Sequence, residues 1–460
     1  MRNMLRYLEK EILEGKLLKL YKKIFFNLIV ITFIVSLFQN NLTLVNAQSL
    51  NIEAESAILV DADTGKILYA KNADIKLPPA SMTKMMTEYL VLEAIEEGQI
   101  TWDTTTWIGD YPYSISANNS FSGIGLRQNK DYTVRELYEG MAIISDNATT
   151  IALAELIAGS EGEFVKRMNE KGKELGLTDF EFVNSTGLTN ASLGENYPEG
   201  TDPNGDNLIS ARSAALLAYH LINDYPEALE FSSTLMSELD DQPLENLNWM
   251  LPWNNTNFAQ YYVEGVDGLK TGYTEVAGYC FTGTATRDGR RLITVIMKAD
   301  SYGSRFEETA KLLNYGFGEF QKLDLYQAGY QLADHETIEV TKGKEDVVAI
   351  ELAEQITSVV RTGEEDAYSI EYVLDEAKLT EDGKLIAPIE KGEKIGEVKL
   401  NYHGNADYGS ILADEDQQTV DLIAVDGIEK NNWFMLMLGA IGNFFSQLFS
   451  TVVDTVTDWF

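Results

Sequence analysis

The chain contains very little cysteine and histidine, two side chains that often serve as nucleophile, base or metal ligand. It has one cysteine, Cys280, and three histidines, His220, His335 and His403, among 460 residues. One cysteine excludes an intramolecular disulfide, and its apolar surroundings in the sequence predict a small buried side chain. The histidines are scattered, so they show no metal-ligand spacing and give little support to a Ser-His-Asp triad. We therefore expect no metal and no other cofactor.

Basic residues are scarce relative to acidic ones. Lysine and arginine number 36, aspartate and glutamate number 72, and the formal net charge is −36 at pH 7. Such a charge repels the phosphates of nucleic acids and of anionic lipids. The composition therefore argues against a nucleic-acid partner. It also suggests a salty or alkaline external medium, where screening limits the self-repulsion of the chain.

Long hydrophobic runs are confined to the two ends of the chain. Residues 24–35 are mostly apolar, follow Lys22 and Lys23, and precede a cleavage-site pattern at residues 45–47. This order of basic, apolar and small residues is typical of an export signal. Residues 1–47 are therefore predicted to be a signal peptide, and an uncleaved membrane anchor is the alternative.

The C-terminal stretch, residues 429–460, shows a different pattern. Its apolar residues recur on one helical face, but polar residues such as Asn443 and Gln447 interrupt the run. The stretch is therefore predicted to be an amphipathic helix that lies in the membrane interface rather than across the bilayer. The alternative is a helix packed on the protein's own core. An exported chain with this anchor is expected at the outer face of the cytoplasmic membrane or in the cell wall.

Three short motifs occur in order: Ser81-Met82-Thr83-Lys84, Ser145-Asp146-Asn147 and Lys270-Thr271-Gly272. Each is common alone, but the ordered set rarely arises by chance. Residues three apart share one face of a helix, so Ser81 and Lys84 can meet. A serine hydroxyl is a weak nucleophile until a base takes its proton. Lysine can be that base if burial or a nearby cation such as Lys270 makes its neutral form accessible.

The surroundings of the first two motifs support this hypothesis. Prolines within residues 77–80 predict that a helix begins near Ser81, where unpaired backbone N–H groups can stabilise an oxyanion. The alternative is a capping serine followed by a surface lysine. The second motif lies between two apolar helical stretches, 137–144 and 148–156, which predicts a tight turn. A plain helix cap is the alternative there.

The third motif lies in an extended segment, residues 266–274. A predicted hairpin follows, with strands at 279–285 and 292–297 and a turn at 287–290. An extended peptide substrate could pair with the edge of such a strand, and Gly272 leaves room for a close backbone approach. The alternative is an ordinary solvent-facing lysine at position 270.

With these motifs the chain resembles the low-molecular-mass penicillin-binding proteins of the D-alanyl-D-alanine carboxypeptidase family, over about residues 50–425. Residues 57–69 resemble the opening hairpin of that family, 182–188 its Asn-x-x-Gly-Leu segment, and 387–396 its second domain. The resemblance implies a mixed α/β (α+β) fold. Three parts follow in order: a β-lactamase/transpeptidase-like catalytic domain of antiparallel sheet flanked by helices (48–325), a smaller all-β domain (326–428) and the C-terminal helix (429–460).

The resemblance also implies roles for the motif residues. Ser81 would attack the carbonyl between the two terminal D-alanines of a peptidoglycan pentapeptide stem and form an acyl-enzyme. Lys84 would accept its proton. Ser145 would relay the proton toward the leaving amine, and Asn147 would hold the substrate amide. β-Lactams would trap the same serine. The middle residue of the second motif, Asp146, has no expected role.

The carboxylate of the substrate would meet Lys270 and Thr271, beside Gly272. The oxyanion hole would be the backbone N–H groups of Ser81 and Tyr273. Arg305 would help to hold the carboxylate, to which a guanidinium is geometrically suited, and a solvated surface arginine is its alternative. The expected function is thus a serine-type D-Ala-D-Ala carboxypeptidase in cell-wall biogenesis and remodelling.

Two other functions remain open at this point. One is a serine β-lactamase, but a class A enzyme needs an added glutamate to activate the deacylating water, and the sequence shows no convincing counterpart. The other is a non-catalytic peptidoglycan-binding protein with a degenerate site, which the intact motifs oppose.

Overall fold

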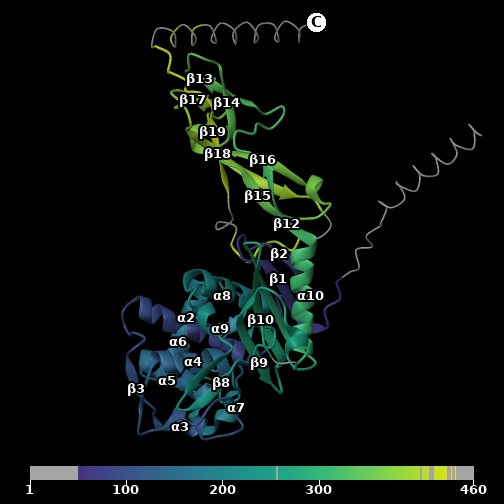
Figure 1. Ribbon diagram of the computed structural model, residues 1–460. Helices are drawn as coiled ribbons and strands as arrows, with labels where there is room; N and C mark the ends of the chain where they lie inside the picture. The colour runs from purple at the N-terminus through teal and green to yellow at the C-terminus, as the bar shows by residue number, and fades with distance from the viewer. Residues whose placement is uncertain are drawn as a thin grey trace, which may run out of the picture. The chain divides into compact units, whose positions relative to one another are not determined.

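The computed structural model describes residues 50–254, 257–404, 407–413 and 419–432, together with Met437 and Ile441 (Figure 1). The expected signal peptide, residues 1–47, lies outside the described residues. The expected anchor helix does so from residue 433 onward, apart from those two residues. None of the described helices combines the length and the apolar character needed to cross a bilayer.

A five-stranded antiparallel sheet forms the centre of the first domain (Figure 1). Alternate residues of its inner strands face opposite sides: Ile58 and Val60 join the core formed with the helices, whereas Leu59 packs against Gly316 on the other face. Because both faces are covered, these strands are nearly continuous apolar runs. The strand order is β2 (Ile67–Lys71), β1 (Ala54–Asp61), β11 (Arg290–Ala299), β10 (Gly278–Arg287) and β9 (Val266–Thr274), with β9 at one edge.

The predicted hairpins are confirmed. Strands β10 and β11 pair with Arg287 opposite Arg290, and both turn residues, Asp288 (φ 51°) and Gly289 (φ 76°), have positive φ. Two positive φ values are what a tight two-residue turn between right-twisted strands requires. Strands β1 and β2 form the expected opening hairpin.

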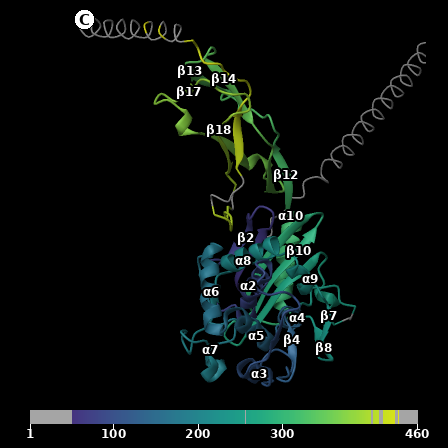
Figure 2. The same cartoon turned by 90° about the vertical axis from the view of Figure 1, so that its left-hand side faces the viewer.

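Helices cover both faces of this sheet. Helix α10 (Ser304–Glu319) packs on one face, and α8 (Ala211–Asp224) packs on the other, where most of the helices gather (Figure 2). Helix α2 (Lys84–Glu96) is buried over most of its circumference because the other helices surround it. The remaining helices are α3 (Asp110–Ser116), α4 (Val134–Ile144), α5 (Asn147–Ala158), α6 (Glu161–Glu174), α7 (Asn190–Leu193) and α9 (Ala228–Ser232).

The helical part of this domain also contains three small two-stranded sheets. They are β3 (Thr105–Trp107) with β4 (Asp131–Thr133), β5 (Phe180–Glu181) with β6 (Leu208–Ile209), and β7 (Met236–Leu239) with β8 (Gln242–Glu245).

The second domain is built from strands around its own apolar core, which includes Ile350, Leu352 and Leu422. The strands predicted at 337–341 and 369–374 are observed as β13 (Thr337–Thr341) and β16 (Tyr368–Leu374). The larger sheet also contains β14 (Val347–Leu352), β17 (Leu385–Ile386), β18 (Lys394–Tyr402) and β19 (Val420–Ala424), and β12 (Phe320–Tyr326) pairs with β15 (Ile356–Arg361).

Candidate active site

The first motif lies at the N-terminal end of helix α2. Ser81 lies in a 3₁₀ turn, Ala80–Thr83, that follows Pro79 and continues directly into the helix at Lys84. The turn brings Lys84 Nζ to 3.0 Å from Ser81 Oγ. The helix start predicted near Ser81 is confirmed, and the alternative of a surface lysine is wrong, because Lys84 is fully buried.

Lys84 is surrounded by groups that only accept hydrogen bonds, apart from the serine. Its Nζ donates to Asn147 Oδ1 (2.9 Å) and to the carbonyl of Thr186 (2.7 Å). A neutral amine has two N–H groups and one lone pair. When these two oxygens take both hydrogens, the lone pair points at the Ser81 hydroxyl, which is the geometry of a general base.

The electrostatic surroundings of Lys84 favour that neutral form. Burial and the nearby charge of Lys270 hold the pKa of Lys84 well below its ordinary value, and the carboxyl groups of Asp146, Glu88 and Glu161 oppose the shift. Lys84 can therefore accept a proton as a base and later donate it as an acid from the same position.

The second motif forms the predicted turn between two helices, α4 and α5. Ser145 ends α4 with a left-handed backbone (φ 60°), and Asn147 begins α5. Ser145 Oγ is buried without a hydrogen-bond partner among the described residues, so its capacity to donate and accept is unused. The amide group of Asn147 has a defined orientation, because Nδ2 donates to the Ser122 carbonyl (3.1 Å) while Oδ1 accepts from Lys84.

Asp146 forms the helix cap that was the alternative interpretation of this motif, and it also makes a contact that the sequence did not predict. Its buried carboxylate accepts hydrogen bonds from the backbone N–H groups of Thr149 (3.0 Å) and Ile124 (2.8 Å). The first bond caps α5, and the second ties the loop before β4 to the same helix. An aspartate directly before an apolar helix is a capping pattern, and this was the available sequence signal.

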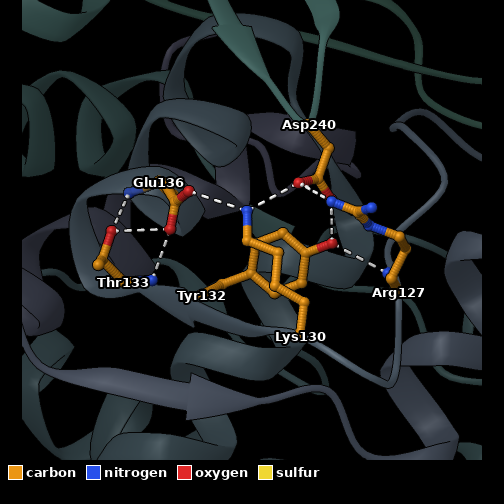
Figure 3. A network of polar contacts seen from close by, with 6 residues as sticks. All are labelled: Arg127, Lys130, Tyr132, Thr133, Glu136 and Asp240. Carbon is orange, nitrogen blue, oxygen red and sulfur yellow. Dashed lines mark hydrogen bonds and ion pairs between the residues drawn. The ribbon is translucent and has the colours of Figure 1, made fainter.

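The other end of that loop is tied down by a second polar network (Figure 3). Asp240, in the turn between β7 and β8, accepts hydrogen bonds from Arg127 (2.6 Å), Lys130 (2.7 Å) and the Tyr132 hydroxyl. Lys130 also pairs with Glu136 (3.2 Å), the third residue of α4. The loop that carries Ser122 is thus attached to α5 at one end and to the β7–β8 hairpin at the other.

The third motif lies on the edge strand β9, as predicted. A Cβ atom at position 272 would collide with the carbonyl of Pro79, so Gly272 allows the strand to approach the turn that carries Ser81. The predicted close backbone approach at Gly272 is therefore observed, and the approaching backbone is that of the protein itself. Lys270 is buried, with Nζ 3.3 Å from the Thr271 carbonyl, and the alternative of a solvent-facing lysine is wrong. Tyr273, which follows Gly272 in the strand, is half exposed.

Arg305 is a buried cation beside the same strand. Near the start of α10, it is 1% exposed, so the alternative of a solvated surface arginine is wrong. Its Nη1 donates to the carbonyls of Gly272 (3.2 Å) and Cys280 (3.4 Å), and its guanidinium lies 4.2 Å from the ring centre of Tyr302. Nε and Nη2 have no partner among the described residues. Buried donors without partners favour an anionic ligand at this place.

Two buried glutamates near Lys84 were also missed. Glu88 lies one turn after Lys84 on α2, 3.5 Å from the Tyr138 hydroxyl, and burial raises its pKa while Lys270 opposes the rise. Glu161, at the start of α6, accepts from Ser185. For Glu88, the sequence signal was a charged residue within an otherwise apolar helix, α2. That signal does not indicate which side chains lie next to the glutamate. Cys280 is buried in β10, as predicted.

The described residues contain no group of three or more His, Cys, Asp or Glu side chains placed to hold a metal ion. A serine hydrogen-bonded to a buried lysine, a buried hydroxyl without a partner in the second motif, and two buried cations on or against an edge strand define a serine acyl-transfer enzyme with lysine as its base.

Comparison with protein-family models agrees with this class. Residues 43–301 match the model described as D-alanyl-D-alanine carboxypeptidase, and residues 320–430 match the C-terminal domain of penicillin-binding protein 5. The chain therefore belongs to the D-alanyl-D-alanine carboxypeptidase family of serine peptidases. The predicted family, fold class and enzyme class are confirmed.

Individual relatives extend over most of the chain. The D-alanyl-D-alanine carboxypeptidase DacF of Bacillus subtilis is 34% identical over 372 residues, which cover 81% of this chain and 87% of DacF. Among solved structures, the peptidoglycan synthesis regulatory factor PBP3 of Streptococcus pneumoniae is 36% identical with a TM-score of 0.65. The match covers 82% of this chain and 100% of the PBP3 chain. Penicillin-binding protein 5 of Haemophilus influenzae is 29% identical with a TM-score of 0.63, at 83% and 98% coverage.

Proposed function

We propose that the chain removes the terminal D-alanine from peptidoglycan pentapeptides through an acyl-enzyme on Ser81, and that β-lactams acylate the same serine. One observation carries this proposal. Lys84 Nζ lies 3.0 Å from Ser81 Oγ, and its two other polar contacts accept hydrogen bonds and cannot donate them.

The reaction then divides into two halves. Ser81 Oγ bonds to the carbonyl carbon while its proton passes to Lys84. The C–N bond breaks as a proton reaches the leaving amine of D-alanine, through the Ser145 hydroxyl. Water then attacks the ester, the same groups exchange the protons in reverse, and the shortened peptide leaves. The unpartnered Ser145 Oγ supports the relay.

The substrate would lie along the edge of β9. Its terminal carboxylate would face Lys270, Thr271 and Arg305, since a buried guanidinium with free donors suits a carboxylate. Its backbone would pair with the strand and with Asn147. The backbone N–H groups of Ser81 and Tyr273 would form the oxyanion hole, a role for which the helical turn at Ser81 is suited.

The test is to mix the purified protein with a fluorescent penicillin and, in parallel, with a D-alanyl-D-alanine-ended pentapeptide. We expect stable covalent labelling, release of D-alanine, and loss of both in Ser81→Ala, whereas Ser114→Ala, an exposed serine, behaves as wild type. Fast loss of the label without D-alanine release would instead indicate a β-lactamase. Absence of labelling would contradict the assignment of Ser81 as the nucleophile.

We further propose that residues 1–47 direct export and that residues 429–460 anchor the enzyme to the outer face of the cytoplasmic membrane. The catalytic domain would then span residues 48–325 and the β-rich domain 326–428. The amphipathic pattern of the C-terminal sequence supports the anchor. A chain ending at residue 428 should lose its association with membranes in cell fractionation while still being labelled by penicillin. Equal membrane association of both chains would contradict the anchor.

A further inference from the structure

We infer that Glu161 is a positioning residue for acylation: acting through Ser185, its side chain holds the Thr186 carbonyl where it accepts a hydrogen bond from Lys84. This inference rests on the proposed function of Ser81 and Lys84. It adds a residue that belongs to none of the three motifs.

The contacts of Glu161 point toward the catalytic lysine. Its Oε1 accepts two hydrogen bonds from Ser185, from the backbone N–H (2.9 Å) and from Oγ (2.6 Å). Its Oε2 accepts from the Tyr111 hydroxyl (2.9 Å). Glu161 and Ser185 are both buried. Burial raises the pKa of Glu161, and the hydrogen bonds from Ser185 and Tyr111 oppose that rise because they favour the charged form.

The segment held by Glu161 lies against the catalytic groups. The Ser185 carbonyl accepts from Thr87 Oγ1 (2.8 Å), and the Thr186 carbonyl accepts from Lys84 Nζ (2.7 Å). A side chain at Gly187 (φ +86°) would collide with the Ala80 carbonyl. The segment 185–187 is therefore fitted between α6 and the turn that carries the nucleophile.

The Thr186 carbonyl matters because it takes one hydrogen of the Lys84 amine. With that acceptor in place and Asn147 Oδ1 taking the other hydrogen, the lone pair can point only at Ser81. If the carbonyl shifts, the amine can rotate and the base loses its direction. A displacement of about 1 Å in such a group can slow a reaction about 10²-fold.

Three substitutions separate position from charge. Glu161→Gln keeps an oxygen acceptor for Ser185 but removes the charge. Glu161→Asp keeps the charge but shortens the side chain by one methylene, so it pulls away from Ser185. Glu161→Ala removes both. Glu163→Gln, on the exposed face of the same helix, is the matched control.

The experiment measures the second-order rate of penicillin acylation per titrated Ser81, together with kcat and KM for the pentapeptide, in the full chain. We expect the acylation rate to fall about 10²-fold in Glu161→Ala and to fall clearly in Glu161→Asp. In Glu161→Gln the rate should stay within about tenfold of wild type. The KM for the pentapeptide should change little in all three variants. Rates counted per labelled site exclude molecules that fail to fold. If Glu161→Ala does not fold, the comparison of the Gln and Asp variants decides alone.

Two results would overturn the inference. One is acylation within about twofold of wild type in all three variants. The other is the reverse order, with Glu161→Asp normal and Glu161→Gln slow, which would assign the role to the charge. Failure of the wild type itself to be labelled, or labelling that persists in Ser81→Ala, would instead contradict the proposed function.

Discussion

At the scale of single residues, one buried lysine lowers the pKa of another. Burial is the main reason why the pKa of Lys84 lies well below its ordinary value, and Lys270 is the cation that lowers it further. Lys270 has a lowered pKa for the same first reason, while the carboxyl group of Glu88 opposes that shift. The third motif thus influences the base, in addition to its proposed contact with the substrate carboxylate.

Replacing Lys270 should therefore move the pH dependence of acylation. Lys84 is active when neutral, so acylation falls as pH drops through its lowered pKa. Lys270→Gln removes a like charge, the pKa of Lys84 rises, and the acidic limb of the profile shifts to higher pH. The profile is measured with a chromogenic β-lactam from about pH 5 to pH 10.

Lys298→Gln is the matched control, because Lys298 is exposed and pairs with Glu55. Its profile should keep the midpoint of the wild type. An acidic limb that stays in place, or moves to lower pH, in Lys270→Gln would show that Lys270 does not influence the base.

At the scale of elements, the loop between α3 and β4 is held by two aspartates. Asp146 binds the Ile124 N–H, and Asp240 binds Arg127, Lys130 and Tyr132 near β4 (Figure 3). Burial tends to raise the pKa of Asp240, but the hydrogen bonds from Arg127, Lys130 and Tyr132 outweigh it and hold that pKa well below its ordinary value. Its carboxylate therefore contributes to stability in the charged form.

Replacing Asp240 should destabilise the protein in a pH-dependent way. Because the folded pKa is depressed, the contribution is fully present above the unfolded pKa, about 3.9, and is lost as pH falls through the folded value. Asp240→Asn should lower the free energy of unfolding by about 1–3 kcal/mol at neutral pH. The difference from wild type should shrink as the pH falls below about 4.

Urea unfolding of both proteins at neutral and acidic pH measures this difference. Asp288→Asn, an exposed aspartate in the turn between β10 and β11, is the control and should behave as wild type at both values. If Asp240→Asn lowered the free energy of unfolding by the same amount at both pH values, the shape of the side chain and not its charge would be responsible.

At the scale of the whole molecule, a strongly acidic chain encloses a cationic site. The net charge is −36, whereas Lys270 and Arg305 are buried cations, one on strand β9 and the other hydrogen-bonded to it. The substrate proposed for this site carries a carboxylate, so it is repelled by the molecule as a whole and attracted only at close range. Salt screens the long-range repulsion by the whole molecule more than the short-range attraction to the buried cations, because the buried cations are less accessible to ions.

Acylation by an anionic penicillin should therefore become faster with salt. Raising the ionic strength from about 0.01 M to about 0.15 M shortens the Debye length from about 30 Å to about 8 Å, and the second-order rate should rise about two- to tenfold. A zwitterionic penicillin with an added ammonium group is the control and should respond less. A rate that falls with salt would mean that the buried cations also govern the approach.

Much of this site could be predicted from sequence because its signals are local. Ser81 and Lys84 are three residues apart on one helical turn, so the spacing alone brings them together. The β10–β11 hairpin follows from strand-forming residues on either side of Asp288 and Gly289. The turn at Ser145 follows from a polar triplet between two apolar stretches. Each signal reflects backbone geometry within a few residues, which the sequence by itself determines.

Only the tertiary structure decided which distant groups complete the site. Lys84 meets Asn147 and Thr186 across 63 and 102 residues, and Arg305 reaches Gly272 across 33. The burial of Arg305, the bond from Ile124 to Asp146 and the approach of Glu161 to Ser185 have no periodic pattern in the sequence. Such contacts depend on how whole helices and strands pack, and a rule that relates neighbouring residues cannot contain them.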